Sequence, residues 1–381
     1  MEHNKVFYWL DLIRGIAALQ VCIGHIRSLF FQDYADVDKS VFTKAFYFLT
    51  GFGHQAVVIF FVLSGFFIIR SIYTAYENSK WSLKNYLIDR LSRLWIVLIP
   101  ALFITLVLDV VGTGLLPESP AYLGKIENLA DINPNDKLHA GVLIGNLFFL
   151  QTIFIPTYGS NAPLWSLAYE FWYYIIFPVL FMAYKVEDGS YKKILLCLIG
   201  LLLLIMVGKS IALYFLIWLM GGASYFLLKR FNTRFLSKPH ILLTIITMFA
   251  VVLSCVRVGI LPVFFNDFSL GVVTAILVVA LVNCNMKFSF LRKIALFISN
   301  ISFTLYLTHM PFAVLITGLI VEQRVAWDID SFFMFILICV TTIAYSYTMW
   351  LLFEKRTPVV KKWIKAKVNS TRKETATTVK A

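Results

Sequence analysis

Charged side chains are scarce in this sequence. Asp, Glu, Lys and Arg make up only 14% of its 381 residues, whereas a soluble domain has about a quarter. Hydrophobic residues account for 60% and recur in long runs from one end of the sequence to the other. This composition predicts that the protein is embedded in a lipid bilayer.

The motifs of soluble enzymes are also missing. The sequence contains no GxSxG, HExxH, P-loop or GxGxxG string, so hydrolase or nucleotidase chemistry of the soluble kind has no support. The five cysteines are odd in number, lack CxxC spacing and lie mostly in apolar runs (Cys22, Cys197, Cys255, Cys284 and Cys339). We therefore expect small buried thiols, no disulfides and no metal site.

The net charge of +13 raises the question of a nucleic-acid partner. The basic residues lie in short loops and in the C-terminal tail, without a groove-binding module, so we expect no nucleic acid. Basic loops on the cytoplasmic side of a membrane protein explain the charge better. The first apolar run is too long and too charged for a cleavable signal peptide, and we expect it to remain as the first spanning helix.

Ten apolar runs approach the roughly 20 residues that a membrane-spanning helix needs. They cover residues 8–30, 52–74, 94–113, 164–184, 194–208, 211–228, 240–257, 268–283, 294–320 and 331–353. An eleventh run, 141–155, is shorter. If this run does not cross and residue 1 is cytoplasmic, most of the 34 Lys and Arg residues lie on the cytoplasmic side, as the positive-inside rule requires. The basic residues left outside are then Arg27, Lys39, Lys44, Lys125, Lys137, Lys209, Arg257 and Arg324.

The expected fold is therefore an all-α integral membrane bundle of about ten transmembrane helices, with both termini cytoplasmic. Residues 114–163 form an external loop that holds one re-entrant or interfacial helix. Residues 1–355 make up the transmembrane domain. Residues 356–381 form a basic cytoplasmic tail that is able to contact anionic membrane lipid.

The first predicted helix carries ionisable side chains inside its apolar run. Arg14 and His25 are eleven residues apart, which is about 20° past three helical turns, so both project from one face about 16 Å apart. Asp11 lies one turn before Arg14 and can pair with it. One interpretation is an anchoring ion pair and a hydrogen-bonded packing histidine. The other is functional, because buried ionisable groups usually face a polar cavity and histidine suits general-base work.

Two further clusters combine polar and apolar residues. Glu170 lies about six residues into a span that begins outside, one turn after Ser166, and either snorkels to the headgroups or orients His25 or a substrate. Arg90 and Arg93 lie at the cytoplasmic edge of a span, where they either anchor the helix or bind phosphate oxygens. Arg70 ends the preceding span at the same level, so the three arginines can converge.

Other polar residues in the spans are less specific. Ser64 and Gly65 predict close helix packing. His54 is a second candidate for chemistry at the outer side. His309, inside a span just before the helix-kinking Pro311, is either a hydrogen-bonded structural histidine or a functional one.

Taken together, these strings resemble the membrane acyltransferase-3 family over residues 8–355. The resemblance rests on LDLIRGIAALQVCIGH, GHQAVVIFFVLSGF, RLSRLW, LWSLAYEFWYYIIFP, and ISFTLYLTHMPF followed by FEKRTP. It implies transfer of an acyl group, usually acetyl from acetyl-CoA, to a sugar hydroxyl of a cell-surface or exported glycan such as O-antigen. Arg14 and His25 match the family's essential arginine and histidine, Arg90 and Arg93 its pair for the CoA donor, and Glu170 its acidic residue. Some relatives carry an additional esterase-like domain that this sequence lacks, so we expect a mechanism confined to the membrane domain.

The resemblance predicts an enzyme of the cytoplasmic (inner) membrane with two polar layers. Acetyl-CoA would bind through Arg90, Arg93 and Arg14 at the inner face, and a glycan or lipid-linked sugar acceptor would meet His25, oriented by Glu170, near the outer face. Direct transfer and an acyl-histidine intermediate are both open. The prediction requires a continuous hollow between the two layers. The rival interpretations are a transporter or flippase of an envelope glycan, in which the same charges line a path, and a scaffold for envelope synthesis enzymes.

Overall fold

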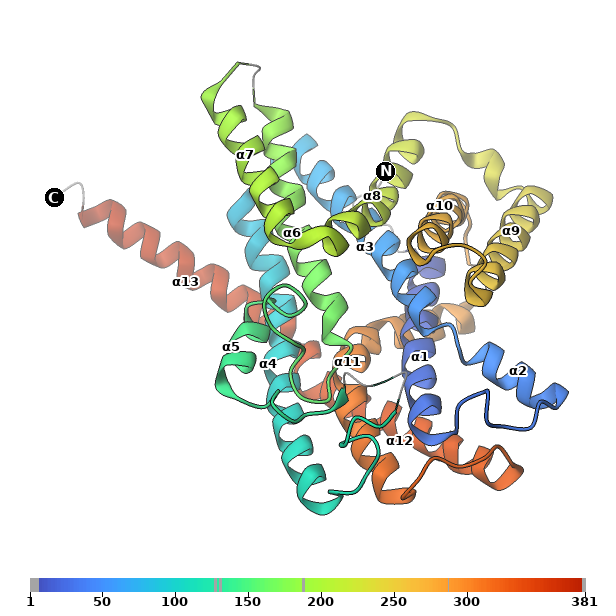
Figure 1. The fold of residues 1–381 in the computed structure, drawn as a ribbon. Helices are drawn as coiled ribbons and strands as arrows, with labels where there is room; N and C mark the ends of the chain where they lie inside the picture. The colour runs from blue at the N-terminus through green and yellow to red at the C-terminus, as the bar shows by residue number, and fades with distance from the viewer. Residues whose placement is uncertain (1–6, 127–128, 130–131, 187–188, 287, 379–381) are drawn as a thin grey trace.

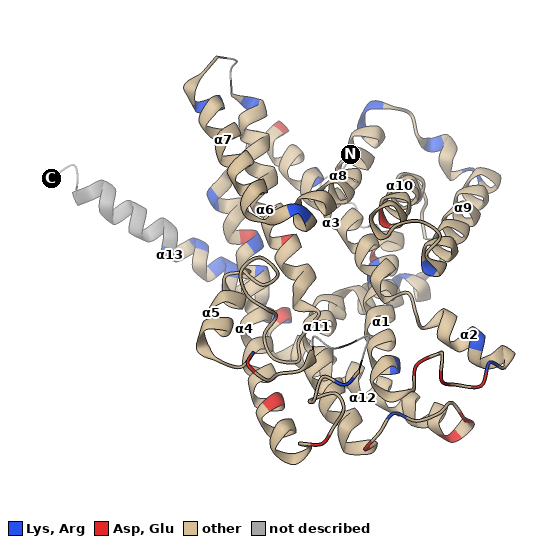
Figure 2. Ribbon diagram, viewed as in Figure 1, with Lys and Arg blue, Asp and Glu red and all other residues tan. Residues whose placement is uncertain are grey.

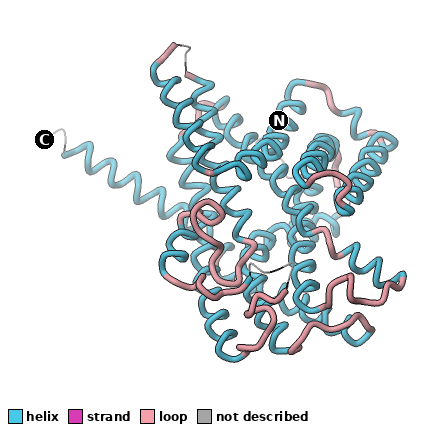
Figure 3. Tube along the Cα trace, in the orientation of Figure 1, coloured by secondary structure: helices cyan, strands magenta, loops and turns pink. Residues whose placement is uncertain are grey.

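The chain is a bundle of helices of unequal length (Figure 1). The structure is a computed structural model that describes residues 7–126, 129, 132–186, 189–286 and 288–378. Its α-helices are α1 (Tyr8–Phe30), α2 (Val41–Leu49), α3 (Gly53–Glu77), α4 (Leu83–Leu115), α5 (Ala140–Leu147), α6 (Leu164–Lys185), α7 (Tyr191–Met206), α8 (Gly208–Arg230), α9 (Pro239–Val258), α10 (Val263–Val282), α11 (Ser289–Ile320), α12 (Ile329–Leu352) and α13 (Thr357–Thr378). Figure 3 shows these helices joined by loops, with no strand in the described ranges.

The predicted all-α integral membrane bundle is confirmed. Nine helical segments of the described chain are long and apolar enough to cross a membrane. The predicted span 194–208 corresponds to α7, which has 16 residues and is about 24 Å long at 1.5 Å per residue, short of the roughly 30 Å hydrocarbon core. The run 141–155 contains the eight-residue α5, which is too short to cross, as expected.

Charge is distributed unevenly along the bundle. Figure 2 shows Lys and Arg gathered around the α6–α7 and α8–α9 connections and on α13, whereas the loops at the opposite end carry several Asp and Glu residues. This is the asymmetry on which the predicted orientation rests. The tail predicted to follow residue 355 folds as α13, and Lys365 pairs with Asp89 of α4 at 2.8 Å.

Local sequence signals set several helix ends. The Ser40 hydroxyl accepts the Thr43 amide at the start of α2, as an N-cap residue does. Asp328 does the same for α12 by accepting the Ser331 amide at 2.8 Å, and this hydrogen bond holds the pKa of the Asp328 carboxyl below its usual value. Gly259 ends α9 with φ of 78°, a conformation that glycine adopts without strain.

Helix α1 lies in the middle of the bundle and packs mainly along α11 and α3. The second close pairing joins α3 to α8, where two glycines let the backbones approach. A Cβ atom on Gly65 would meet the backbone carbonyl of Trp218, and one on Gly221 would meet that of Val62. The predicted packing role of Gly65 is therefore confirmed. The prediction of burial holds for Cys22 and Cys339 but is wrong for Cys197, which is exposed on α7.

Replacing Gly221 with valine is expected to destabilise the fold by at least 1–3 kcal/mol, roughly the cost of overpacking a close contact. The reason is that the new side chain would collide with the backbone of α3. The measurement is the melting temperature of the detergent-purified protein. Gly114→Val is the matched control, because a Cβ on this helical glycine meets nothing within 4 Å. Equal melting temperatures of the two variants would refute the packing role.

Candidate active site

A cavity of about 330 Å³ lies among α1, α3, α4, α6 and α11. We call it the inner cavity. Arg14, Arg90, Arg93 and Glu170 all line it, and the rest of its wall is apolar or bears hydroxyl groups. The structure thus brings together four of the five residues that the sequence singled out for catalysis and donor binding.

Arg14 is fixed by residues from two helices. Its guanidinium lies 3.3 Å from Asp11 and also donates to the Ser299 hydroxyl of α11. Ser299 in turn donates to Asp11 at 3.0 Å. The predicted Asp11–Arg14 pair is therefore confirmed, and it orients a cation on the cavity wall.

Arg90 and Arg93 reach the inner cavity from adjacent turns of α4. Arg90 donates to the Ser71 hydroxyl at 3.1 Å, and the Arg93 guanidinium lies 5.8 Å from the centre of the Phe303 ring. Arg70 instead lies over the ring of Phe7 and is not among the residues lining the cavity. The arginine that completes the cluster is therefore Arg14 rather than Arg70. Three guanidinium groups and one carboxylate line the wall, and Asp11 and Glu354 lie close enough to Arg14 and Arg93 to offset part of the positive charge. Guanidinium groups in such a cluster suit phosphate oxygens.

Glu170 is held within the wall of the inner cavity by hydroxyl donors. Ser64 of α3 donates to it at 3.0 Å, and Tyr174, one turn further along α6, also donates to the same carboxylate oxygen. Trp218 donates to Ser64 at 3.2 Å. Ser64 therefore helps to position the Glu170 carboxylate, whereas the sequence predicted only a packing role for it.

His25 is hydrogen-bonded to a second histidine. Its Nδ1 atom lies 2.9 Å from Nε2 of His309 in α11, and the two rings are nearly parallel. Nδ1 of His309 lies 2.8 Å from the Leu305 carbonyl oxygen, which can only accept, so this nitrogen carries the hydrogen. In neutral His309, Nε2 is then an acceptor for the Nδ1–H of His25. This assignment leaves Nε2 of His25 with a free lone pair, the form a general base requires.

Arg14 and His25 both contact α11, through Ser299 and His309. This confirms that they share one face of α1. The predicted orientation of His25 by Glu170 is wrong, because Glu170 lines the inner cavity and His309 holds His25 instead.

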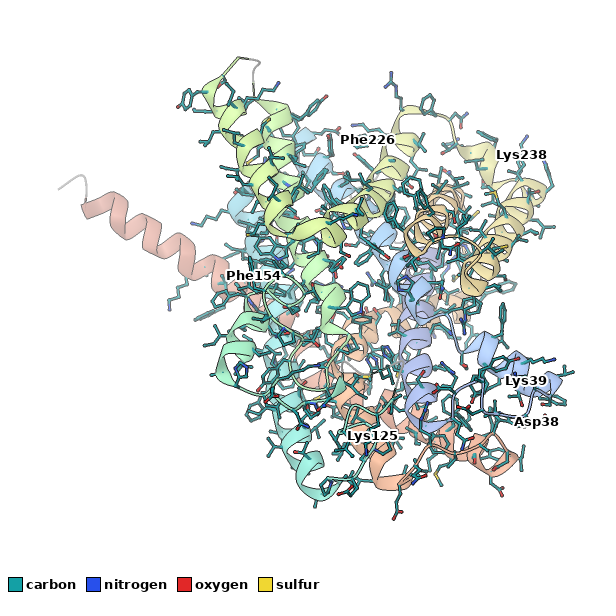
Figure 4. The ribbon with its side chains drawn as sticks, viewed as in Figure 1. Asp38, Lys39, Lys125, Phe154, Phe226 and Lys238 are labelled. Carbon is teal, nitrogen blue, oxygen red and sulfur yellow. The ribbon has the colours of Figure 1, made fainter. Side chains whose placement is uncertain are left out.

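His25 lines a separate and larger cavity of about 1160 Å³, which we call the outer cavity. The residues around it come from the end of α1, α2, the start of α3 and the end of α9, and from the loops that flank α2; Leu129 of the α4–α5 connection completes the wall. In Figure 4 the labelled Asp38 and Lys39 mark this end of the bundle, and Phe226 and Lys238 mark the opposite end. His54 also lines the outer cavity, and its Nε2 lies 2.8 Å from the buried Asp267 of α10. Tyr214 donates to the same carboxylate.

The residues lining the two cavities do not overlap. Tyr306 is part of the inner cavity's wall on the side toward the histidine pair: its ring centre is 6.0 Å from that of Phe60, which also lines this cavity, and 6.2 Å from that of His309, the partner of His25. The Tyr306 hydroxyl is hydrogen-bonded to Ser166 at 2.6 Å. The expected continuous hollow is therefore not formed in this structure: an aromatic layer closes it.

The turn of α11 that carries His309 is held from outside the helix. Pro311 has no amide hydrogen and so leaves the Leu307 carbonyl without its helical partner. The Asn161 side chain donates to this carbonyl at 2.8 Å. The neighbouring Ser160 donates through its amide and its hydroxyl to the buried Asp109 of α4, at 2.7 and 2.6 Å. The loop before α6 thus fixes the position of the histidine pair.

The sequence profile of an acyltransferase domain, that of the acyltransferase-3 family, matches residues 7–351. The chain belongs to this family. It is 31% identical over 166 residues to the peptidoglycan O-acetyltransferase OatA of Listeria monocytogenes, covering 42% of this acyltransferase and 24% of the relative. It is 30% identical over 190 residues to putative O-acetyltransferases of Staphylococcus aureus, covering 47% of this chain and 26% of each relative. The matches thus span about a quarter of the length of these relatives. No solved structure matches this acyltransferase significantly.

Sequence reasoning missed two site residues of this acyltransferase and undervalued a third. Asp267 was detectable as an isolated carboxylate in the apolar run of α10. Tyr306 had no distinguishing signal among 18 tyrosines. His309 did have a signal in its spacing: it lies ten residues after Ser299 on α11, and His25 lies eleven residues after Arg14 on α1, the helix that packs against α11. Within the described residues, no group of three or more His, Cys, Asp or Glu side chains is arranged to hold a metal ion.

Proposed function

We propose that this acyltransferase is a membrane O-acetyltransferase that moves an acetyl group from cytoplasmic acetyl-CoA to a sugar hydroxyl at the other face of the membrane. The observation that carries the proposal is the arrangement along α1. Arg14 lines a cavity with two more arginines, and His25, on the same face of the helix, lines a second cavity. The relatives named O-acetyltransferases support the same chemistry.

The inner cavity is the proposed donor site. Arg14, Arg90 and Arg93 would bind the phosphate oxygens of acetyl-CoA through charge-assisted hydrogen bonds. The apolar part of the wall, which includes Leu94 and Phe303, suits the slim pantetheine arm and the acetyl group. Glu170, held by its two hydroxyl donors, would limit the positive charge and direct the phosphates toward the arginines.

The outer cavity is the proposed acceptor site. Nε2 of His25 would take the proton of the sugar hydroxyl as the hydroxyl oxygen attacks the thioester carbon. The carbon–sulfur bond breaks, the new ester stays on the sugar, and the protonated His25 returns its proton to the departing CoA thiolate. His309 would hold the imidazole in the required tautomer. In the alternative order, the same nitrogen attacks first and an acetyl-histidine forms.

Both orders require the thioester to pass the aromatic layer. Tyr306 contacts Phe60 on one side and His309 on the other. Rotation of the Tyr306 and Phe60 rings would open the layer beside His25 and leave the hydrogen bond between His309 and His25 intact. In this account the closed layer keeps water away from the thioester until an acceptor is bound.

The test is release of free CoA by the purified protein with acetyl-CoA, with and without sugar acceptors. Acceptor-dependent release, with acetyl ester on the sugar, is the expected result. Movement of a glycan without any acyl chemistry would instead identify a transporter or flippase. Unchanged function after alanine replacement of Arg14, His25 and Arg93 would identify a scaffold. Mass spectrometry of the surface glycan, with and without the gene, would then identify the acceptor.

A further inference from the structure

Basic residues converge on the outer cavity although they lie on the side of the membrane where such residues are disfavoured. Of the eight Lys and Arg residues predicted to lie outside, Arg27, Lys44 and Arg257 line this cavity. A fourth, Arg324, pairs at 2.8 Å with Asp33, which also lines it. Half of the predicted outside basic residues therefore gather at one site.

The two arginines of the wall occupy defined positions. The guanidinium of Arg257 lies against Gly51, so closely that a Cβ atom there would overlap it. The guanidinium of Arg27 lies 5.0 Å from the centre of the Tyr47 ring and donates to Ser28 at 2.9 Å. These contacts leave their charges in place but do not neutralise them.

Among the described lining residues, the wall supplies one acid, Asp33, for the four basic residues at this site, Arg27, Lys44, Arg257 and Arg324. The charge of Asp33 is shared between Arg324 and Arg27. The Nε atoms of Arg27 and Arg257 are buried without a hydrogen-bond partner in the part of the chain described. The two guanidinium groups thus bring to the cavity wall positive charge that a single carboxylate does not balance, and an oxyanion in the cavity would pair with it.

We propose that the outer cavity binds its acceptor through an oxyanion, a phosphate or a carboxylate, held by Arg27 and Arg257. The inference deepens the proposed function, on which it rests for the role of the cavity. It identifies the acceptor class as a negatively charged sugar, either a phosphate-linked sugar lipid or an acidic glycan. Because His25 lines the same cavity, an anion anchored on the arginines would place a neighbouring hydroxyl near the base and restrict its motion.

The test is direct binding without any acyl donor, so that no reaction is needed. Two matched pairs of probes are used: a glucuronic-acid oligosaccharide and its glucose counterpart, and a prenyl-phosphate-linked hexose and the same prenyl hexoside without phosphate. In the wild-type protein, the acidic member of at least one pair is expected to bind about tenfold tighter or more, as loss of one charged hydrogen bond would predict. The two pairs separate carboxylate from phosphate as the anchoring group.

Variants locate the preference in the structure. Arg257→Gln and Arg27→Gln are expected to reduce the affinity for the acidic probe to that for its neutral partner. Gly51→Ala retains every charge but displaces the Arg257 guanidinium. This variant is also expected to bind the acidic probe with lower affinity. Lys209→Gln is the control, because it removes an exposed basic residue that is predicted outside and does not line the cavity.

Three results would overturn the inference. The first is equal affinity for the acidic and neutral probes, and the second is a preference for the acidic probe that survives in Arg257→Gln. The third is binding of phosphatidylglycerol micelles with no preference among the sugar probes, which would indicate a site for lipid headgroups. The transfer assay on the same samples separates this inference from the proposed function. Charge-selective binding without acetyl transfer would refute the function alone, and transfer to neutral and acidic acceptors alike would refute the inference alone.

Discussion

Replacing His25 with alanine is expected to lower the rate of acetyl transfer by a factor of about 10²–10⁴, the usual contribution of a general acid–base residue. In the proposed mechanism the imidazole acts as the base, and the contact with His309 gives it the required tautomer, with Nδ1–H donated and Nε2 free. Since the outer cavity adjoins His25, added imidazole is expected to restore part of the lost rate. The measurement is the single-turnover rate of ester formation in the purified variant.

A variant of His309, the hydrogen-bond partner of His25, is the control for this prediction. His309→Phe keeps a ring of similar size but removes the acceptor for His25 Nδ1–H. We expect a loss of about tenfold or more in kcat, a changed pH profile, and an unchanged KM for the acyl donor, because His309 acts only through His25. Imidazole should not rescue this variant. A wild-type rate in His25→Ala, with the protein folded in the membrane, would remove His25 from the mechanism.

The second large effect concerns the donor site. Arg90→Ala combined with Arg93→Ala is expected to raise the KM for acetyl-CoA about a hundredfold or more, because each charged hydrogen bond is worth roughly 1.5–3 kcal/mol. S-acetyl pantetheine lacks the nucleotide phosphates, so its KM should change little in the same variant. A comparison of the two donors therefore separates phosphate binding from general damage to the cavity.

Arg234→Ala is the matched control for the donor site. This arginine is exposed in the connection between α8 and α9 and does not line the inner cavity. It should leave the KM of both donors unchanged. An equal rise in KM for acetyl-CoA and for S-acetyl pantetheine in the Arg90, Arg93 double variant would contradict the assignment of these arginines to the phosphates.

The sequence correctly predicted which site residues lie close together when both residues are on the same helix. Arg14 and His25 share a face because eleven residues return to nearly the same angle on a helix, and Asp11 pairs with Arg14 for the same reason. Arg90 and Arg93 reach one cavity because they are neighbours on α4. The spans followed from hydropathy, since a bilayer demands long apolar runs.

Relations between helices were not predictable in the same way. The contact between His25 and His309 depends on the register of α1 against α11, which the close packing of the two helices and the contacts of Ser299 with Asp11 and Arg14 determine. The assignment of Glu170 to His25 failed because one sequence does not specify the depth of α6 relative to α1. The aromatic layer at Tyr306 was invisible for the same reason, because in the sequence it is one more aromatic residue in a spanning run.

The central claim is that acetyl passes from one face of the membrane to a sugar at the other, beside His25. Proteoliposomes with one orientation of the protein test it most directly, with labelled acetyl-CoA supplied only on the side of the α6–α7 loop and an oligosaccharide acceptor only on the other side. The account predicts labelled ester on the acceptor and none with His25→Ala. Label that reaches the acceptor only when donor and acceptor share one compartment would contradict it.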